Sequence, residues 1–300
     1  MRCALSFSLA LLVACSSGPR KPAPEVPHRE RTAGDDMLGM LPAGASAVIE
    51  IDALRLRTNA AVGRFIAALA ARADQPDDPE LVRLVLGILR HSDAAVIAVY
   101  DAGKPGARTL VLLRGLAEAG QAGAARIDAR IHALGPPELV DQVRAIAGGA
   151  AALTVGLDAE WMILRARAMP EAAPGAWLRV TARLDFDARV DLASRFDLDA
   201  VPRQLSVWAD VVDDLALVAW LDGDNPREGK QLGQAVLAAA DRARRSAPGT
   251  RILLSPILQG LTVKAGGASA RATIVVGPRA LTALVDTLVP PPPPPPKEGS

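Results

Sequence analysis

Apolar residues recur along this chain with the two spacings that distinguish helices from strands. Residues 46–51 (SAVIEI) predict a first strand, with Glu50 as its one charged member. Residues 58–72 predict a helix, because apolar side chains recur at i, i+3, i+4 and i+7, namely at Val62, Phe65, Ile66 and Leu69. A second helix is expected to begin at Asp78-Pro79 and to run to about Arg90. It is apolar on most faces, which is typical of a helix that covers a sheet.

Several pairs of apolar segments are separated by short polar or glycine-rich segments, as in β-hairpins. Each pair predicts two antiparallel strands: 94–100 with 108–114, 204–212 with 215–221, and 261–264 with 268–276. Residues 177–186 alternate as a further strand, and shorter strands are expected at 126–130 and 131–134. Residues 226–245 predict a long amphipathic helix that follows the turn at Asp222 to Asn225.

The two halves of the chain end in the same way. Leu134-Gly135-Pro136 and Val276-Gly277-Pro278 each join a strand to an amphipathic helix, and the apolar stripes of the two helices match at the same offset. Proline is common at the first helical position, so the motif alone is weak evidence. The shared order of hairpin, strands and helix nevertheless favours an internal duplication, in which residues 94–147 superpose on residues 204–289. The expected fold class is α+β, with mostly antiparallel sheets, amphipathic helices packed on one face, and two similar lobes.

The N-terminal residues have the features of a secretion signal. Arg2 precedes an uncharged apolar run, Ala4 to Ala14, that is too short to span a bilayer. The run ends in Leu12-Val13-Ala14-Cys15, which resembles the lipobox of bacterial lipoproteins. That resemblance implies cleavage before Cys15, which would become the lipid attachment site. The absence of Asp after Cys15 then favours the outer membrane over the inner membrane; a plain secretory signal is the alternative.

These features divide the chain into five expected segments. They are a signal peptide (1–14), a lipidated Cys with a proline-rich tether (15–36), an N-terminal α+β lobe (37–171), a C-terminal α+β lobe (172–289) and a polyproline tail (290–300). The seven consecutive prolines of the tail form a stiff rod that serves either as a spacer or as a ligand for an aromatic groove. The start of the N-terminal lobe, Leu41-Pro42-Ala43-Gly44 followed by a Val-rich strand, weakly resembles uncharacterised secreted proteins of the DUF3352 type, and this resemblance implies no activity.

Composition excludes several classes of function. The 34 basic and 33 acidic residues leave a net charge of +1, which argues against a nucleic-acid-binding protein. Two cysteines and three histidines leave little material for a metal site, so we expect no metal and no cofactor. His28 is expected in the tether, His91 at a helix end and His132 on a strand. No phosphate-binding loop, serine elbow or complete calcium loop is present.

Acidic residues do gather in the second half, and paired carboxylates can carry out acid–base chemistry. The set is Asp185, Asp187, Asp191, Asp197, Asp199, Asp210, Asp213 and Asp214. Arginines alternate with them, which favours a solvated surface of mixed charge over a catalytic site. We therefore expect no catalytic residues and a binding or structural role in the cell envelope. The alternatives are a periplasmic carrier of an apolar ligand such as a lipid, a hydrolase that uses the Asp clusters, and an inhibitor or chaperone of a secreted partner. The expected partners are the membrane, through Cys15, and an envelope protein or apolar ligand.

Overall fold

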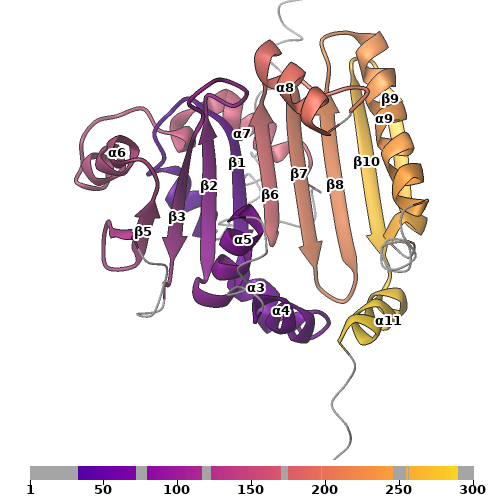
Figure 1. Ribbon diagram of the computed structural model, residues 1–300, viewed down its shortest axis with the longest axis horizontal. Coiled ribbons are helices and arrows are strands. Elements are labelled where there is room, and N and C mark those ends of the chain that lie inside the picture. Colours follow the sequence, from indigo (N-terminus) through magenta and orange to yellow (C-terminus); the bar gives the residue numbers. More distant parts are fainter. Residues whose placement is uncertain are drawn as a thin grey trace, which may run out of the picture. The chain divides into compact units, whose positions relative to one another are not determined.

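A single antiparallel sheet of ten strands organises the chain, in the order β4-β5-β3-β2-β1-β6-β7-β8-β10-β9 (Figure 1). In this computed structural model the described residues are 33–71, 80–116, 123–169, 175–196, 198–245, 255 and 257–289. The strands are β1 (Ala45–Asp52), β2 (Ala94–Tyr100), β3 (Arg108–Arg114), β4 (Ala125–Arg126), β5 (Ile131–Leu134), β6 (Leu178–Arg183), β7 (Gln204–Val211), β8 (Leu215–Asp222), β9 (Leu261–Gly266) and β10 (Ser269–Val276). The expected α+β class is therefore present, built on one sheet.

The strand order is symmetrical about its centre. The first half of the chain supplies β1 to β5 and the second half supplies β6 to β10, and each half runs outward from the β1–β6 pair in the same order. Gly135 follows β5 and Gly277 follows β10, and these two strands occupy matching places in the order. The two halves share one sheet through the β1–β6 pair, and the described residues form one compact unit.

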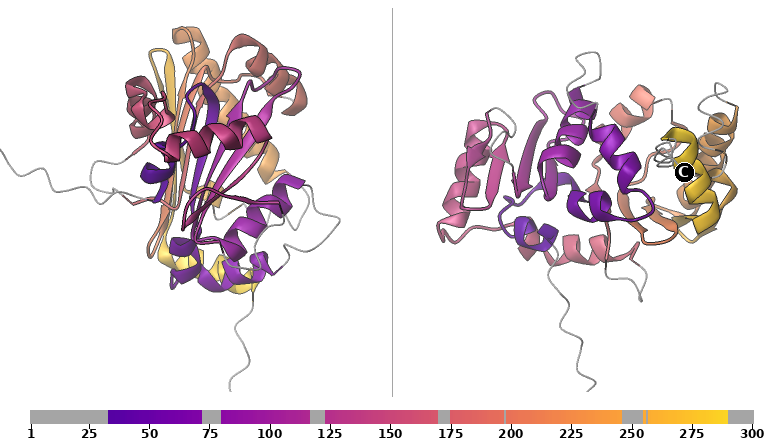
Figure 2. Two further views of the ribbon diagram at one scale, coloured as in Figure 1. Left: turned by 90° about the vertical axis from the view of Figure 1, so that its left-hand side faces the viewer. Right: turned by 90° about the horizontal axis from the view of Figure 1, so that it is seen from below.

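The helices lie on both faces of the sheet, whereas the sequence suggested one (Figure 2). One face carries α2 (Ala33–Leu38), α6 (Pro137–Ala147) and α7 (Ala159–Ala166), with the short helix η1 (Val155–Leu157). The other carries α3 (Ala53–Thr58), α4 (Gly63–Ala70), α5 (Glu80–His91), α8 (Phe186–Phe196), α9 (Pro226–Arg244) and α11 (Pro278–Leu288). The reason lies in β2 and β3, whose apolar runs have side chains to bury on both faces.

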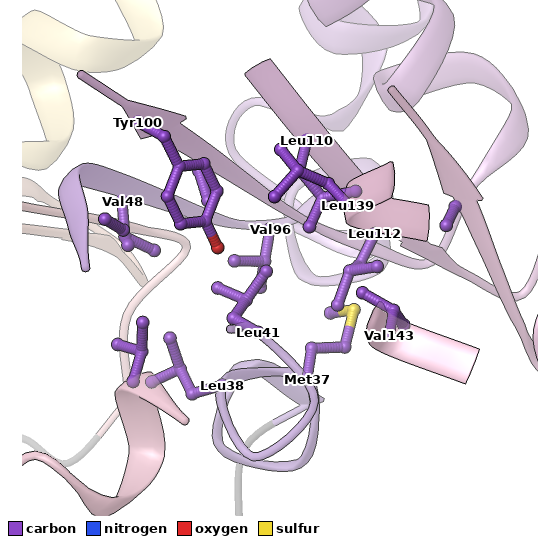
Figure 3. Close-up of a cluster of buried hydrophobic side chains, with 14 of the residues drawn as sticks. Met37, Leu38, Leu41, Val48, Val96, Tyr100, Leu110, Leu112, Leu139 and Val143 are labelled. Carbon is purple, nitrogen blue, oxygen red and sulfur yellow. The ribbon is translucent and has the colours of Figure 1, made fainter. Parts of the chain in front are cut away.

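The buried cluster on the α2 side is made entirely of residues from the first half of the chain (Figure 3). Met37 and Leu38 of α2 pack with Val96 and Leu112 of the sheet, and all four are almost completely buried. Tyr100 lies beside them, and its hydroxyl donates to the carbonyl of Pro42 at 2.9 Å. Burial raises the pKa of Tyr100 well above its usual value. Residues 33–36, assigned to the tether from sequence, therefore belong to a helix that the core requires.

Three other local expectations need correction. Of the strand expected over 126–130, only Ala125–Arg126 (β4) forms. The helix expected over 58–72 is two helices, because the Asn59 side chain accepts from the backbone of Ala61 and Val62 and interrupts the helix there. The strand expected over 177–186 ends at Arg183, and Phe186 begins α8 instead. Asp185 causes this change, since its carboxylate caps the helix by accepting from the Ala188 amide at 2.9 Å.

Candidate functional site

The candidate binding surface is a set of half-buried apolar side chains at the centre of the sheet, which we call the apolar floor. It consists of Ile49 on β1, Val180 on β6, Val207 on β7, and Leu217 and Ala219 on β8. Strand register places Ile49, Val180, Val207 and Ala219 opposite one another in a single row. Leu217 lies in the adjacent row, opposite Ala209. These residues share one face because they are an even number of positions apart along each strand or directly paired across strands.

Helices surround the apolar floor on its own face of the sheet (Figure 1). The group α3–α5 packs against β1 to β3, and α9 packs against β9 and β10, with Gly233 of α9 beside Val263 and Ala265. At one end of the strands, Ala188 of α8 packs against Ala182. At the other end, α11 buries Leu281 and Val285 against the sheet. Among the described residues, no helix covers the strands in between, and the floor side chains stay half-buried.

The surroundings of the floor are also apolar. The row of Leu217 also contains Leu178, Ala209 and Ile274, and the row on the other side of the floor contains Ala182, Leu205 and Leu221. Strands lie about 4.8 Å apart, so a floor that runs from β1 to β8 is about 14 Å wide. An α-helix with its side chains is about 10 Å across, so this width admits a helix or several extended hydrocarbon chains. The five floor residues can therefore bury apolar surface of a ligand. None of them carries a charged or titratable group that could take part in catalysis.

The opposite face of β9 and β10 is mostly polar, as in an ordinary half-solvated antiparallel sheet, whereas the opposite face of β8 carries Val218 and Trp220, which pack with Ala168 and Trp208. Thr262, Lys264 and Arg271 are exposed there, and Trp220 is half-buried with its indole N–H donated to Asp222 at 2.9 Å. Arg167 also pairs with Asp222. In β9 and β10 the alternation of polar and apolar side chains therefore assigns the apolar side to α9 and to the face of the floor.

A second feature is a buried ionic cluster where the two halves meet. Arg165 of α7 donates from Nε and Nη2 to the two carboxylate oxygens of Glu50, each at 2.6 Å, and pairs with Asp35 at 2.8 Å. Arg179 on β6 lies 3.8 Å from Glu50. Burial by itself would lower the pKa of Arg165, but Glu50 and then Asp35 outweigh it and raise that pKa above its usual value. Glu50 stood out in the sequence, whereas no local pattern pointed to its partners.

The ionic cluster is better suited to holding elements together than to chemistry. A small open recess adjoins it and is lined in part by Glu50, Asp52 and Arg179. Both Glu50 oxygens, however, are already bonded to Arg165, and two carboxylates balance two guanidinium groups. The cluster joins α2 and α7 to the β1–β6 pair. A buried pair of this kind fixes geometry, and its net contribution to stability is small because desolvation offsets the attraction.

The Asp residues noted in the sequence do not converge. Asp185 and Asp187 lie beside the start of α8, near the Gln204 end of β7, whereas Asp213 and Asp214 follow its Val211 end. The eight residues of β7 separate these groups by about 27 Å. Asp210 is buried and bonded to Arg55 through two hydrogen bonds of 2.8 and 2.7 Å. The remaining members lie elsewhere: Asp191 on α8, Asp199 in an ion pair with Arg242, and Asp197 outside the described residues.

The other residues singled out from the sequence also have local roles. His91 ends α5 and His132 lies on β5, while Cys15, His28, Asp78-Pro79 and the polyproline tail fall outside the described residues. Asn225 caps α9 by accepting from the amides of Arg227 and Glu228, so the acidic turn leads into a helix as expected. In the part of the chain that the structure describes, no three His, Cys, Asp or Glu side chains are grouped to hold a metal ion.

Comparison with known proteins adds no relative. No family model, no curated protein and no solved structure matches this chain. Within the described ranges, no helix has both the length and the apolar character needed to cross a membrane.

Proposed function

We propose that this protein is a lipid-anchored component of the cell envelope that binds an apolar ligand, such as the acyl chains of a lipid, without catalysing a reaction. The observation that carries the proposal is the apolar floor: a row of Val, Ile, Leu and Ala side chains that the surrounding helices leave half-buried. Fully burying a Val, Leu or Ile side chain is worth about 1.5–3 kcal/mol, and the floor residues have part of that still to gain from a ligand.

The anchor in this proposal is lipid on Cys15, supported by the Leu12-Val13-Ala14-Cys15 motif at the end of an apolar run. The outer membrane is the favoured location. Mass spectrometry of the native N-terminus is expected to find diacylglyceryl-modified Cys15. Cleavage at another position, with Cys15 unmodified, would contradict the anchor and leave the ligand proposal to be judged on its own.

We also propose that the two halves arose by duplication. The symmetrical strand order supports this origin, as do Gly135 and Gly277 at the ends of matching strands. The closing helices differ in position, because α6 packs on the α2 side and α11 on the floor side. The conformations of the two glycines differ as well: φ is 153° at Gly135 and −64° at Gly277. The chain therefore leaves β5 and β10 in different directions.

A pair of matched variants tests the ligand proposal. Val207→Gln places an amide on the floor, whereas Val275→Gln makes the same change at a residue of β10 that is 48% exposed on the opposite face. We expect Val207→Gln to weaken binding of a fluorescent fatty acid at least about ten-fold, and Val275→Gln to leave it unchanged. Lipid extracted from the purified chain, identified by mass spectrometry, is expected to decrease in the same variant.

A bulky substitution provides an independent check. Ala219→Trp would fill part of the floor and is expected to exclude the fatty acid while the chain stays folded by circular dichroism. Equal fatty-acid binding by the unsubstituted chain and both floor variants would rule out the floor as a ligand site. If the floor variants instead lose a co-purifying envelope protein and bind no lipid, the occupant is a partner's amphipathic helix, and the carrier proposal is wrong.

A further inference from the structure

A second apolar surface lies on the other side of the sheet, around α7. Among the described residues nine large apolar side chains are exposed, and three of them lie within eleven positions of one another: Leu153 is 77% exposed, Leu157 is 69% exposed and Ile163 is 63% exposed. We call these three residues the α7 patch. The segment 148–157 (GGAAALTVGL) that supplies Leu153 and Leu157 contains no charged residue. Scattered exposed apolar residues are normal, but two in one uncharged segment, with a third on the helix that follows it, call for an explanation.

The fold does not require the α7 patch. The inner side of α7 is formed by Trp161 and Leu164, each 2% exposed, and by Arg165, which bonds to Glu50. Ile163 lies between these residues in sequence and faces away from the body of the protein. The amide of Ala43 donates to the carbonyl of Leu153 at 3.1 Å, so the backbone there is held while the side chain remains exposed. The patch is therefore a fixed surface with no partner among the described residues.

The chain enters the folded body next to this patch. The described residues begin at Ala33 with α2, and Asp35 of α2 pairs with Arg165 of α7 at 2.8 Å. Close to the end of α2, Gly39 approaches Gly156 of η1 so closely that a side chain at Gly156 would contact the Gly39 backbone. Figure 2 shows α2 and α7 on the same side of the sheet. An anchor on the residues before α2 would therefore hold the folded body from the side that carries the α7 patch.

The length of the tether makes this position informative. Residues 16–32, which include four prolines, separate Cys15 from α2. A flexible chain of this length has a root-mean-square reach of about 23 Å, and complete extension at about 3.1 Å per residue would give about 53 Å. A compact body of this size has a radius of gyration of about 18 Å, so its diameter exceeds the reach of the flexible chain, and the side that α2 enters lies nearest the anchor for any tether short of complete extension. A body held by lipid on Cys15 would therefore keep its α2–α7 side toward the membrane. Tethering also raises the effective concentration of the patch at the bilayer, so a weak contact is sufficient.

We propose that the α7 patch is a membrane-docking surface, with Leu153, Leu157 and Ile163 inserted into the interface of the bilayer that holds the anchor. The proposal rests on the lipid anchor proposed above, and its occupant is a lipid surface. The driving force is apolar burial, because the exposed charges of α7 give little attraction to anionic lipids: Glu160 is acidic, and Arg167 at the end of the helix is paired with Asp222. Docking in this way leaves the apolar floor, on the opposite face, accessible to its ligand.

Site-specific labelling tests the insertion directly. Only Cys3 and Cys15 are cysteines, so the unlipidated chain 15–300 carrying Cys15→Ser has no thiol and accepts a single introduced label. An environment-sensitive dye on Ile163→Cys is expected to shift its emission to the blue when phosphatidylethanolamine–phosphatidylglycerol vesicles are added. The same dye on Phe186→Cys, a position 75% exposed on α8, is expected to show no shift.

Vesicle co-sedimentation supplies the second readout. Replacing Leu153, Leu157 and Ile163 by Ser is expected to weaken vesicle binding of the Cys15→Ser chain at least about ten-fold, with no loss from Phe186→Ser. Raising the salt to about 0.5 M is expected to change binding less than about two-fold, since apolar insertion is not screened. No blue shift at Ile163→Cys, or equal binding by the triple variant, would overturn the proposal, as would a loss of binding in salt.

These outcomes are separable from those for the proposed function. Because the vesicle experiments use a chain without lipid, an unmodified native Cys15 would refute the anchor without affecting the measurement of docking. Fatty-acid binding by the triple Ser variant is expected to equal that of the parent chain. Loss of vesicle binding with fatty-acid binding retained would support docking by the patch alone.

Discussion

The two halves of the sheet differ in how many of their faces are buried. In the first half, β2 and β3 are buried on both faces, and Val96, Leu110 and Leu112 are each 0% exposed. In the second half, β8 is half-buried along most of its length, and β9 is partly or fully exposed throughout. The same strand order therefore supports two different surfaces: a core closed by helices on both sides, and a sheet that keeps one apolar face half-open.

This difference explains why the second half is the better place for a binding site. A strand that is buried on both faces can present nothing to a ligand, and changes there affect stability. A half-open apolar face retains free energy that is released when another molecule covers it. The comparison implies that substitutions in the first half act on folding, and that matched substitutions in the second half have smaller effects on folding.

The largest effect on stability is expected where the halves meet. Glu50→Ala would leave Arg165 without its main partner in a buried site, and breaking a buried pair in this way costs about 3–5 kcal/mol. As the control, Asp224→Ala removes a partner of Arg189 at a more exposed site in the second half and is expected to cost less than about 1 kcal/mol. Urea unfolding of both variants measures this difference. Similar losses of unfolding free energy for both variants would mean that the Glu50 ion pair contributes no more to stability than the exposed Asp224 pair.

Core truncation compares the two halves directly. Leu112 on β3 and Leu217 on β8 occupy matching strands, but Leu112 is 0% exposed and Leu217 is half-buried. Leu112→Ala is expected to lower the free energy of unfolding by about 3 kcal/mol, because it leaves a cavity, and Leu217→Ala by about 1 kcal/mol. Equal losses in urea titrations would show that Leu217 is as fully covered as Leu112, which would contradict the half-open floor.

Local elements of this fold could be predicted from the sequence, because they depend on neighbouring residues. The runs at 94–100 and 215–221 predicted strands, and Asn225-Pro226 preceded the expected helix start. The errors arose where one side chain overrides a pattern, as Asn59 does between α3 and α4. They also arose where long-range packing recruits a short polar segment, as it does for α2.

The sheet and the candidate site were not predictable in the same way. Joining the halves requires β1 to pair with β6, more than a hundred residues away, and no local pattern specifies that partner. From the sequence, Val180 and Leu217 are expected to be ordinary inward-facing strand residues. Their exposure depends on where α5 and α9 pack on the sheet. Arg165 was equally inconspicuous, because its partner Glu50 is distant in sequence.

The two closing glycines give a further comparison of the halves. At Gly135, φ is 153° and an added Cβ would lie 2.8 Å from the carbonyl oxygen of Thr109, so Gly135→Ala is expected to cost about 2 kcal/mol. At Gly277, φ is −64° and no atom lies within 4 Å of such a Cβ, so Gly277→Ala is expected to change stability by less than about 0.5 kcal/mol. Thermal unfolding of the pair checks this, and equal sensitivity would show that the two turns are built alike.

The smallest effect compares one helix cap from each half and depends on pH. Asp158 caps α7 by accepting from the Trp161 amide, and Asn225 caps α9 by accepting from the Arg227 and Glu228 amides. Replacing either residue by Ala is expected to cost about 1 kcal/mol near pH 7.

The response to acid separates the two caps. The hydrogen bond from the Trp161 amide, with a smaller contribution from Arg183, lowers the pKa of Asp158 below its usual value. A carboxylate with a lowered pKa stabilises the fold above its unfolded pKa of about 4, and this contribution is lost as the pH falls through the folded value. Urea titrations at descending pH should therefore show the effect of Asp158→Ala vanishing in acid, while the effect of Asn225→Ala persists because an amide does not titrate. A constant difference for Asp158→Ala at every pH would show that its charge contributes nothing to the cap.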